Sequence, residues 1–194
     1  MASPVTHAVV AVAVAVGLRV PRIPPRYWAI GIFCAEAPDL DAIGFWAGLP
    51  YHSLLGHRGL THSVLFAMLL SWFFARLVGG AGDISPARLW CFLFVSTVSH
   101  GVLDAMTDGG LGVAFLSPFD PARYFLPFRP IHVSSMSLWD LLGAHGVNVL
   151  VSECIWVWIP CALLIAVTII RRRPADELMM RWLLSKAGTN GFDP

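Results

Sequence analysis

Residues 149–170 read VLVSECIWVWIPCALLIAVTII, and the only charged side chain in this stretch is that of Glu153. A helix of about 20 predominantly apolar residues crosses the hydrocarbon core of a bilayer, which is roughly 30 Å thick. Three arginines, Arg171 to Arg173, follow directly. The stretch therefore predicts a membrane-spanning helix, and with it an all-α membrane protein.

The composition of the whole chain agrees with a membrane environment. Hydrophobic residues make up 57% and charged residues 13% of the 194 residues, whereas soluble domains have about half and about a quarter. Because no repeat or composition shift divides the chain, we expect one membrane-embedded domain over residues 1–173 and a short cytoplasmic tail over residues 174–194. A net charge of +1 without a basic patch gives no reason to expect a nucleic-acid partner. The oligomeric state stays open.

Four further apolar segments precede this helix, and they cover residues 5–18, 27–37, 62–78 and 89–104. The first two are short, so they form either a hairpin that reaches partway through the bilayer or spans completed by flanking residues. Pro21, Pro24 and Pro25 enforce the turn between them. We therefore expect a polytopic bundle of four to five membrane-embedded helices.

The positively charged side chains of such a bundle would gather at one of its two ends. If consecutive segments alternate in direction, ten of the thirteen Lys and Arg residues fall at one end. By the positive-inside rule this end and the C-terminus face the cytoplasm. These ten residues are Arg19, Arg22, Arg26, Arg76, Arg88, Arg171, Arg172, Arg173, Arg181 and Lys186.

All seven histidines and eight of the twelve acidic residues fall at the opposite end. A polar site is therefore expected on the extracytoplasmic face. The histidines are His7, His52, His57, His62, His100, His132 and His145, and the acidic residues are Glu36, Asp39, Asp41, Asp104, Asp108, Asp120, Asp140 and Glu153.

His100 and Asp104 are four residues apart, which places their side chains on one helix face at about 6 Å. A histidine and a carboxylate at the end of a membrane helix are costly unless they are paired, solvated or bound to metal. We interpret them as metal ligands. The alternative is a hydrogen-bonded pair that ties two helices together.

The stretch Gly56-His57-Arg58-Gly59-Leu60-Thr61-His62-Ser63 supplies two further imidazoles. If Thr61 caps the following helix, only His62 lies on regular helix, and a turn must bring His57 to it. Both are candidate metal ligands. The alternative is one ligand and one group that orients it or contacts substrate.

Asp39 and Asp41 follow Pro38 at the end of the second segment, where paired carboxylates can bridge ions or hold one while the other orients a histidine. A solvated helix end is the alternative. His7 and Glu153 lie at the same level on the first and fifth segments. Imidazoles and carboxylates without thiolates suit Zn²⁺, Mn²⁺ or Fe²⁺ in an open catalytic site.

In this order, the motifs resemble the YdjM-like family of inner-membrane-associated, metal-dependent hydrolases. The matching pieces are Thr6-His7, Pro38-Asp39-Leu40-Asp41, residues 56–63, residues 99–107 and residues 116–128. The resemblance implies a bacterial inner-membrane hydrolase. It extends distantly to zinc-dependent phospholipase C and the S1/P1 nucleases, which are all-helical and cleave phosphate esters.

That distant resemblance maps His7, one of Asp39 and Asp41, one of His57 and His62, and finally His100 and Asp104 onto a metal cluster. Those enzymes also use a processed N-terminal amine and further histidines, which have no match here. One or two ions are therefore expected, with zinc as the first choice.

The expected reaction is hydrolysis of a phosphate ester in a lipid or lipid-linked substrate. Bound metal would lower the pKa of a water to about 7 and activate it for attack. Asp39 or Glu153 would take its proton, and Arg58 would act beside them. Arg123 and Arg129 would recognise the phosphate, or alternatively anchor a loop to lipid headgroups.

The aromatic-rich segment 111–142 would serve as a membrane anchor or as a flap over a lipid. Two rival functions stay open. An ion- or proton-coupled transporter would place polar residues at several depths, and a non-catalytic membrane protein would use the metal only to tie its fold together.

Overall fold

The computed structural model describes residues 1–18, 24–79, 84–134 and 143–171. Within these ranges the chain is helical, as predicted, and it contains only isolated β-bridges in place of strands. Each of the five predicted apolar segments forms a helix. The elements are α1 (Pro4–Gly17), α2 (Pro25–Glu36), η1 (Ala37–Asp41), α3 (Ala42–Trp46), η2 (Leu60–His62), α4 (Val64–Val78), α5 (Pro86–Ala105), α7 (Ala144–Glu153) and the π-helical η3 (Cys154–Trp158).

Local signals set where these helices begin. Pro4, Pro25 and Pro86 occupy the first turns of α1, α2 and α5, where a missing N–H costs nothing. Helix α4 begins later than predicted because Ser63, not Thr61, is its N-cap. The Ser63 hydroxyl accepts a hydrogen bond from the Phe66 N–H at 3.1 Å.

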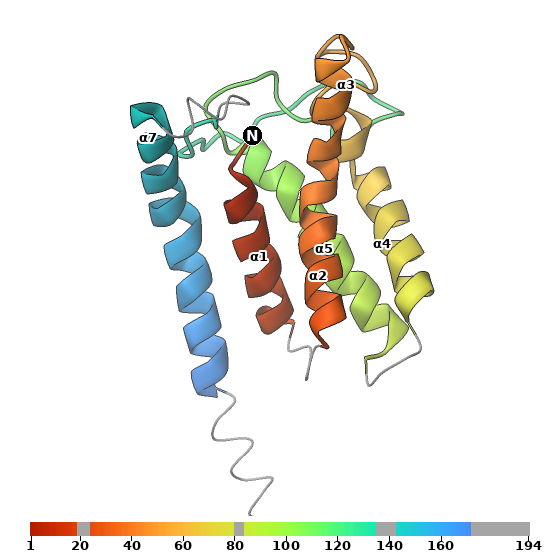
Figure 1. Cartoon of the computed structure of the whole chain (residues 1–194), viewed down its shortest axis with the longest axis vertical. Coiled ribbons are helices and arrows are strands. Elements are labelled where there is room, and N and C mark those ends of the chain that lie inside the picture. The colour runs from red at the N-terminus through yellow and green to blue at the C-terminus, as the bar shows by residue number, and fades with distance from the viewer. Residues whose placement is uncertain (19–23, 80–83, 135–142, 172–194) are drawn as a thin grey trace, which may run out of the picture.

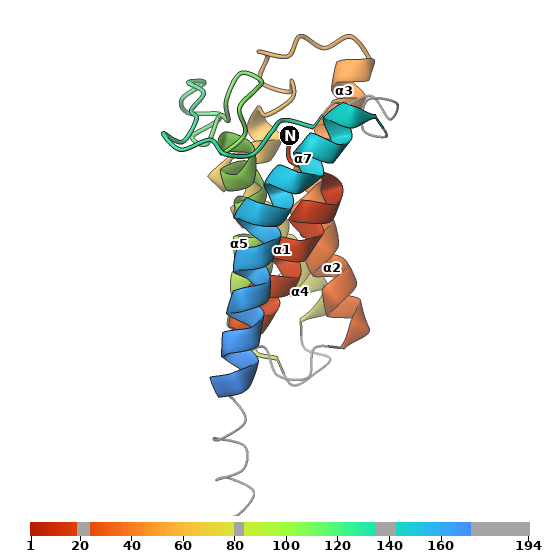
Figure 2. The same cartoon turned by 90° about the vertical axis from the view of Figure 1, so that its left-hand side faces the viewer.

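Helix α5 is the centre of the bundle, and it packs against α1, α2 and α4 (Figures 1 and 2). Gly31 lets α2 approach closely, because a Cβ there would lie 2.2 Å from the Phe92 ring. Phe92 belongs to a buried cluster that also contains Tyr27, Leu89 and Leu93. The last helix runs beside α1 and contacts it through η3.

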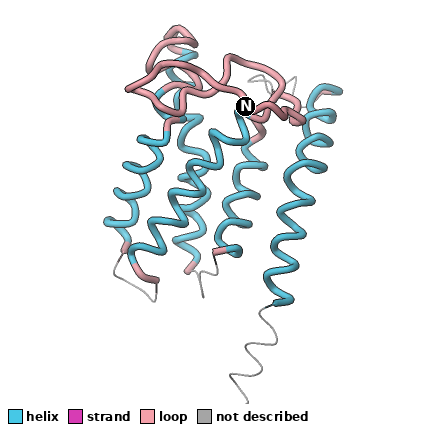
Figure 3. Tube along the Cα trace, turned by 180° about the vertical axis from the view of Figure 1, so that it is seen from behind, coloured by secondary structure: helices cyan, strands magenta, loops and turns pink. Residues whose placement is uncertain are grey.

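Successive helices alternate in direction, and the long connections gather at one end of the bundle (Figures 1 and 3). The starts of α1, α4 and α7 meet the ends of α2 and α5 there. The described part of the chain thus brings the histidine-rich segments to one end. Arg76 and Arg88 lie at the other end, whereas residues 172–194, including the predicted tail, lie outside the described residues.

Within the described residues, one helix is long and apolar enough to cross a membrane, namely Ala144–Arg171 with 28 residues. It contains α7 and η3 and continues to Arg171. Helices α1 and α4 are apolar but shorter. Of the four to five membrane-embedded helices that we predicted, the structure therefore supports one clear spanning helix among the described residues. Further membrane crossings are part of the proposal below.

Candidate metal centre

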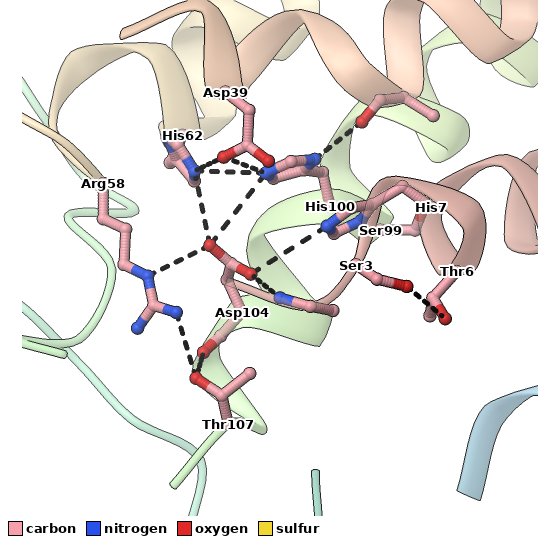
Figure 4. A network of polar contacts seen from close by, with 12 residues as sticks. Ser3, Thr6, His7, Asp39, Arg58, His62, Ser99, His100, Asp104 and Thr107 are labelled. Carbon is pink, nitrogen blue, oxygen red and sulfur yellow. Dashed lines mark hydrogen bonds and ion pairs between the residues drawn. The ribbon is translucent and has the colours of Figure 1, made fainter. Parts of the chain in front are cut away.

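Four side chains from three elements converge at the histidine-rich end, namely Asp39, His62, His100 and Asp104 (Figure 4). One ligand atom from each lies within 4.8 Å of all the others. The Nε2 atom of His100 lies 3.2 Å from His62 Nε2, 3.3 Å from Asp39 Oδ1 and 4.0 Å from Asp104 Oδ2. His62 Nε2 lies 3.6 Å from Asp39 Oδ1 and 3.5 Å from Asp104 Oδ2.

These distances are close to those around a tetrahedral zinc ion. Zinc bonds of about 2.0–2.1 Å to nitrogen and oxygen place neighbouring ligand atoms about 3.3 Å apart. Three elements supply the group: η1 carries Asp39, η2 carries His62, and α5 carries His100 and Asp104 near its end. A spacing of four residues explains why His100 and Asp104 share one face of α5.

The backbone and a second carboxylate orient the two imidazoles. His100 Nδ1 lies 2.6 Å from the Ala35 carbonyl oxygen, so it donates there and leaves Nε2 facing the centre. His62 Nδ1 lies 3.2 Å from Asp41 Oδ2, and its Nε2 also faces the centre. Such outer contacts fix the tautomer and ring orientation of metal-binding histidines.

The tight turn of η1 directs the carboxylates of Asp39 and Asp41 to different sides of His62. Three residues complete one turn of a 3₁₀-helix, so residues two apart point in different directions. Asp39 reaches the Nε2 side of His62, and Asp41 reaches the Nδ1 side. The imidazole of His62 therefore lies between two carboxylates.

Asp41 and His57 form the outer layer of the centre. Asp41 Oδ1 lies 2.7 Å from His57 Nδ1, and Asp41 Oδ2 accepts from the Thr61 hydroxyl at 2.6 Å and from the Arg58 N–H at 3.1 Å. Asp41, His57 and His62 form a second group with metal-binding geometry. Since their close contacts are with one another, we interpret Asp41 and His57 as orienting groups for His62.

Arg58 is fully buried and holds Asp104 in place. Its Nε donates to Asp104 Oδ2 at 3.0 Å, while Nη1 donates to the Gly109 carbonyl at 2.9 Å and Nη2 to the Thr107 hydroxyl at 3.0 Å. Its backbone has a positive φ of 62°, which a side chain rarely adopts without support from its surroundings. The guanidinium predicted to act in catalysis is thus occupied with Asp104.

The charges of the centre favour a cation. The three carboxylates of Asp39, Asp41 and Asp104 outnumber the two positive groups beside them, which are the Arg58 guanidinium and the buried amine of Met1. Burial opposes ionisation of Asp39, but the charge of His100 and the approach of His62 outweigh it and hold the Asp39 pKa below its usual range. Burial also disfavours protonated His62, yet its close contacts with three carboxylates raise its pKa to about 10.

Asp39 and His7 have all their polar side-chain atoms buried without hydrogen-bond partners, which is rare in folded proteins. Both oxygens of Asp39 and both ring nitrogens of His7 are in this state. A cation would satisfy them, and the donor set of imidazoles and carboxylates matches zinc, manganese or ferrous iron. The residues present therefore fit a divalent metal.

His7 lies directly beside the four-donor group. Its ring stacks on that of His100 at a centroid distance of 3.7 Å, and its Nε2 lies 4.0 Å from Asp104 Oδ1. Asp104 thus presents Oδ2 to the four-donor group and Oδ1 toward His7. Oδ1 also accepts a hydrogen bond from the Ala2 N–H at 2.8 Å.

Glu153 is fully buried, and both its oxygens are engaged by the start of α1. It accepts hydrogen bonds from the Ser3 N–H, the Ser3 hydroxyl and the Thr6 hydroxyl, the last at 2.8 Å. Trp158 donates to the same Thr6 hydroxyl at 2.7 Å. The structure therefore places Glu153 in a clamp between the last helix and α1, where it contacts Thr6, the residue before His7.

The two predicted phosphate-binding arginines lie in different settings. Arg123 is half-buried and donates to the carbonyl oxygens of His57 and Tyr51 at 2.9 and 3.0 Å, and to that of Ser53 at 3.4 Å. Arg129 is exposed, with its guanidinium 4.8 Å from the centre of the Phe125 ring.

Several contributors were missed by the reasoning from sequence. Glu36, the last residue of α2, has a buried Oε1 without a partner three residues before Asp39. Thr61 contacts Asp41 and His62, and Thr107 joins Arg58 to the end of α5. A hydroxyl or carboxyl within three residues of a predicted ligand was the available signal.

The comparisons with known proteins place the chain in a class. It belongs to the YdjM inner membrane protein family, whose match covers residues 1–175. It is 41% identical over 176 residues to the inner membrane protein YbcI of Escherichia coli (strain K12), an alignment that covers 89% of this chain and 100% of that protein. No solved structure matches. The family and the relative both support the inner membrane as its location.

Proposed function

We propose that this protein is a membrane-bound, metal-dependent hydrolase that cleaves a phosphate ester of a lipid or lipid-linked substrate. The observation that carries the proposal is the convergence of Asp39, His62, His100 and Asp104 on one buried point. Two imidazoles and two carboxylates without a thiolate are typical of catalytic rather than Cys-rich structural zinc sites. Zinc is the first choice, with manganese or ferrous iron as alternatives and His7 available for a second ion.

When bound, the cation supplies a Lewis acid and lowers the pKa of a coordinated water to about 7. The protein's own part is to hold the ligands rigidly: the Ala35 carbonyl and Asp41 orient the imidazoles, and Arg58 fixes Asp104. Asp39 and Glu36 have buried carboxylate oxygens without partners. We assign the proton of the attacking water to Glu36, because Asp39 serves as a metal ligand and Glu153 is held by Ser3 and Thr6.

The membrane part of the proposal is a multi-pass chain whose centre faces the extracytoplasmic side and whose C-terminus is cytoplasmic. The alternating helix directions and the exposed Arg76 and Arg88 at the far end support it. Exposed apolar side chains on α4, such as Leu69, Trp72 and Leu77, would face lipid.

One observation favours a second candidate, a metal that only ties the fold together. His7, His100 and Asp104 are fully buried, and 11% of the Asp39 side chain is exposed. A closed site of this kind can bind metal without admitting substrate. Hydrolysis, and not metal content, separates the two functions.

The test is metal analysis together with a hydrolysis screen of protein purified in detergent without chelators. The variants are His100→Ala and Asp104→Asn, and the matched controls are His132→Ala and Asp108→Asn, an exposed His–Asp pair 2.7 Å apart. We expect at least one metal per chain in the wild type and the controls, and its loss in both site variants. The same pattern is expected for cleavage of p-nitrophenyl phosphate and phosphatidic acid.

Metal-free wild-type protein would overturn the proposal. Metal retained without cleavage of any ester would favour the structural alternative.

A further inference from the structure

An apolar groove opens between α4 and the loop that follows α5. Its volume is about 350 Å³, and its apolar walls are Val64, Leu65, Met68, Phe115, Leu116 and Phe119. The loop is fixed to the helix, because the Val64 N–H donates to the Phe115 carbonyl at 3.0 Å. Phe119 is 84% exposed beside the groove. The groove is therefore a built feature with an open side.

The groove continues along α4. A second apolar cavity of about 420 Å³ is lined by Leu69, Trp72 and Trp90, and it shares Met68 with the groove. The distance from Val64 to Trp72 along the helix is about 12 Å at 1.5 Å per residue. Together the two cavities make an elongated apolar track, which suits a flexible hydrocarbon chain.

The other end of the groove meets a small pocket whose mostly apolar wall includes a few polar side chains. This pocket, of about 60 Å³, is lined in part by His52, Ser53 and Arg123, and it shares Ser117 with the groove. The three hydrogen bonds of Arg123 to the protein use at most three of its five N–H donors. The remaining donors are available to an anion.

Asp120 also lines the groove, but its carboxylate is occupied. One oxygen accepts from the Ala122 N–H at 2.8 Å and the other from the Tyr124 hydroxyl at 3.1 Å. The small pocket therefore retains the Arg123 guanidinium and the His52 imidazole as its functional groups. An apolar track joined to such a pocket matches an amphipathic anion.

We propose that this surface is a specific binding site for an anionic phospholipid, with one acyl chain in the track beside α4 and the phosphate at Arg123 and His52. Membership of an inner-membrane family supplies phospholipid as the surrounding medium. Arginine binds phosphate through charge-assisted hydrogen bonds. The inference concerns binding and does not depend on hydrolysis at the metal centre.

The experiment is native mass spectrometry of the full chain in detergent with equal amounts of palmitoyl-oleoyl phosphatidylglycerol and phosphatidylcholine. The wild type is expected to retain phosphatidylglycerol about tenfold better, because both lipids offer a phosphate but only phosphatidylcholine brings a choline cation close to the Arg123 guanidinium. Met68→Trp fills the track and should lower retention about tenfold, whereas Leu77→Trp, the same change at an exposed position outside both cavities, should not.

The headgroup is tested separately. His52→Ala and Arg123→Gln should reduce the preference for phosphatidylglycerol, and Arg123→Lys should retain it. His52 is exposed, so its variant does not disturb the loop that Arg123 holds. Water-soluble glycerol 3-phosphate at the same concentration should displace no lipid, because it lacks the acyl chain.

Equal retention of both lipids by the wild type, or equal effects of Met68→Trp and Leu77→Trp, would overturn the site. So would displacement of the lipid by glycerol 3-phosphate. Metal content measured on the same samples keeps this outcome distinct from failure of the proposed hydrolase.

Discussion

At the scale of single residues, Asp41 shows how one carboxylate can control a metal ligand without binding the metal. It contacts His57 Nδ1 at 2.7 Å, His62 Nδ1 at 3.2 Å and the Thr61 hydroxyl at 2.6 Å. Asp41→Asn keeps the size of the side chain but removes its charge. We expect metal affinity to fall about 10- to 100-fold, the usual effect of losing an orienting partner.

Competition titration with a chelating dye measures this change. Asp108→Asn is the matched control, since Asp108 is exposed and pairs with His132 outside the centre. If Asp41→Asn removes metal as completely as His100→Ala, then Asp41 is itself a ligand. An unchanged affinity would also contradict the orienting role.

The same residues show how far sequence reasoning reached. The spacing of His100 and Asp104 predicted a shared helix face, and the structure places both in the four-donor group. The sequence alone could not tell which of Asp39 and Asp41 binds the metal and which orients His62. That division depends on the 3₁₀ turn of η1, which points the two carboxylates to opposite sides of His62.

At the scale of elements, the π-helical turn η3 joins the last helix to α1. In a π-turn the hydrogen bond runs between residues five apart, which brings side chains at that spacing toward one face. Glu153 and Trp158 are five apart, and both contact Thr6 at the start of α1. The length of the apolar stretch 149–170 predicted this helix. The π-turn within it could not be predicted, because it leaves no mark on the pattern of hydrophobic residues.

Replacement of Glu153 tests the clamp. In Glu153→Gln the amide loses the charge that holds the Ser3 N–H and the two hydroxyls of Ser3 and Thr6. Hydrogen bonds to a charged group contribute about 1.5–3 kcal/mol each, so we expect the unfolding free energy to fall by about 2 kcal/mol or more. Thermal unfolding in detergent measures it, with Asp120→Asn, at a half-buried carboxylate outside the clamp, as control.

The four-donor group contains no atom of α1. Glu153→Gln protein that remains folded should therefore keep one metal per chain. Unchanged stability, or a loss of metal as complete as in His100→Ala, would contradict the clamp as described.

At the scale of the whole molecule, helix length limits how the bundle lies in a bilayer. Helices α1, α2 and α4 have 14, 12 and 15 residues, which correspond to about 18–23 Å at 1.5 Å per residue. A flat hydrocarbon core is about 30 Å thick. The 28-residue helix Ala144–Arg171 reaches about 42 Å and spans it easily. A full crossing by the short helices requires local thinning of the bilayer.

The proposed orientation gives opposite accessibility to the two ends of the bundle. Ala122, at the histidine-rich end, and Arg88, at the start of α5, are both exposed. In a background where Cys34, Cys91, Cys154 and Cys161 are replaced by alanine, Ala122→Cys should react with a membrane-impermeant maleimide in spheroplasts. Arg88→Cys should react only after lysis, because the arginine-rich end faces the cytoplasm. The reverse pattern would place the metal centre on the cytoplasmic side, and labelling of both cysteines in intact spheroplasts would contradict a bundle that crosses the membrane.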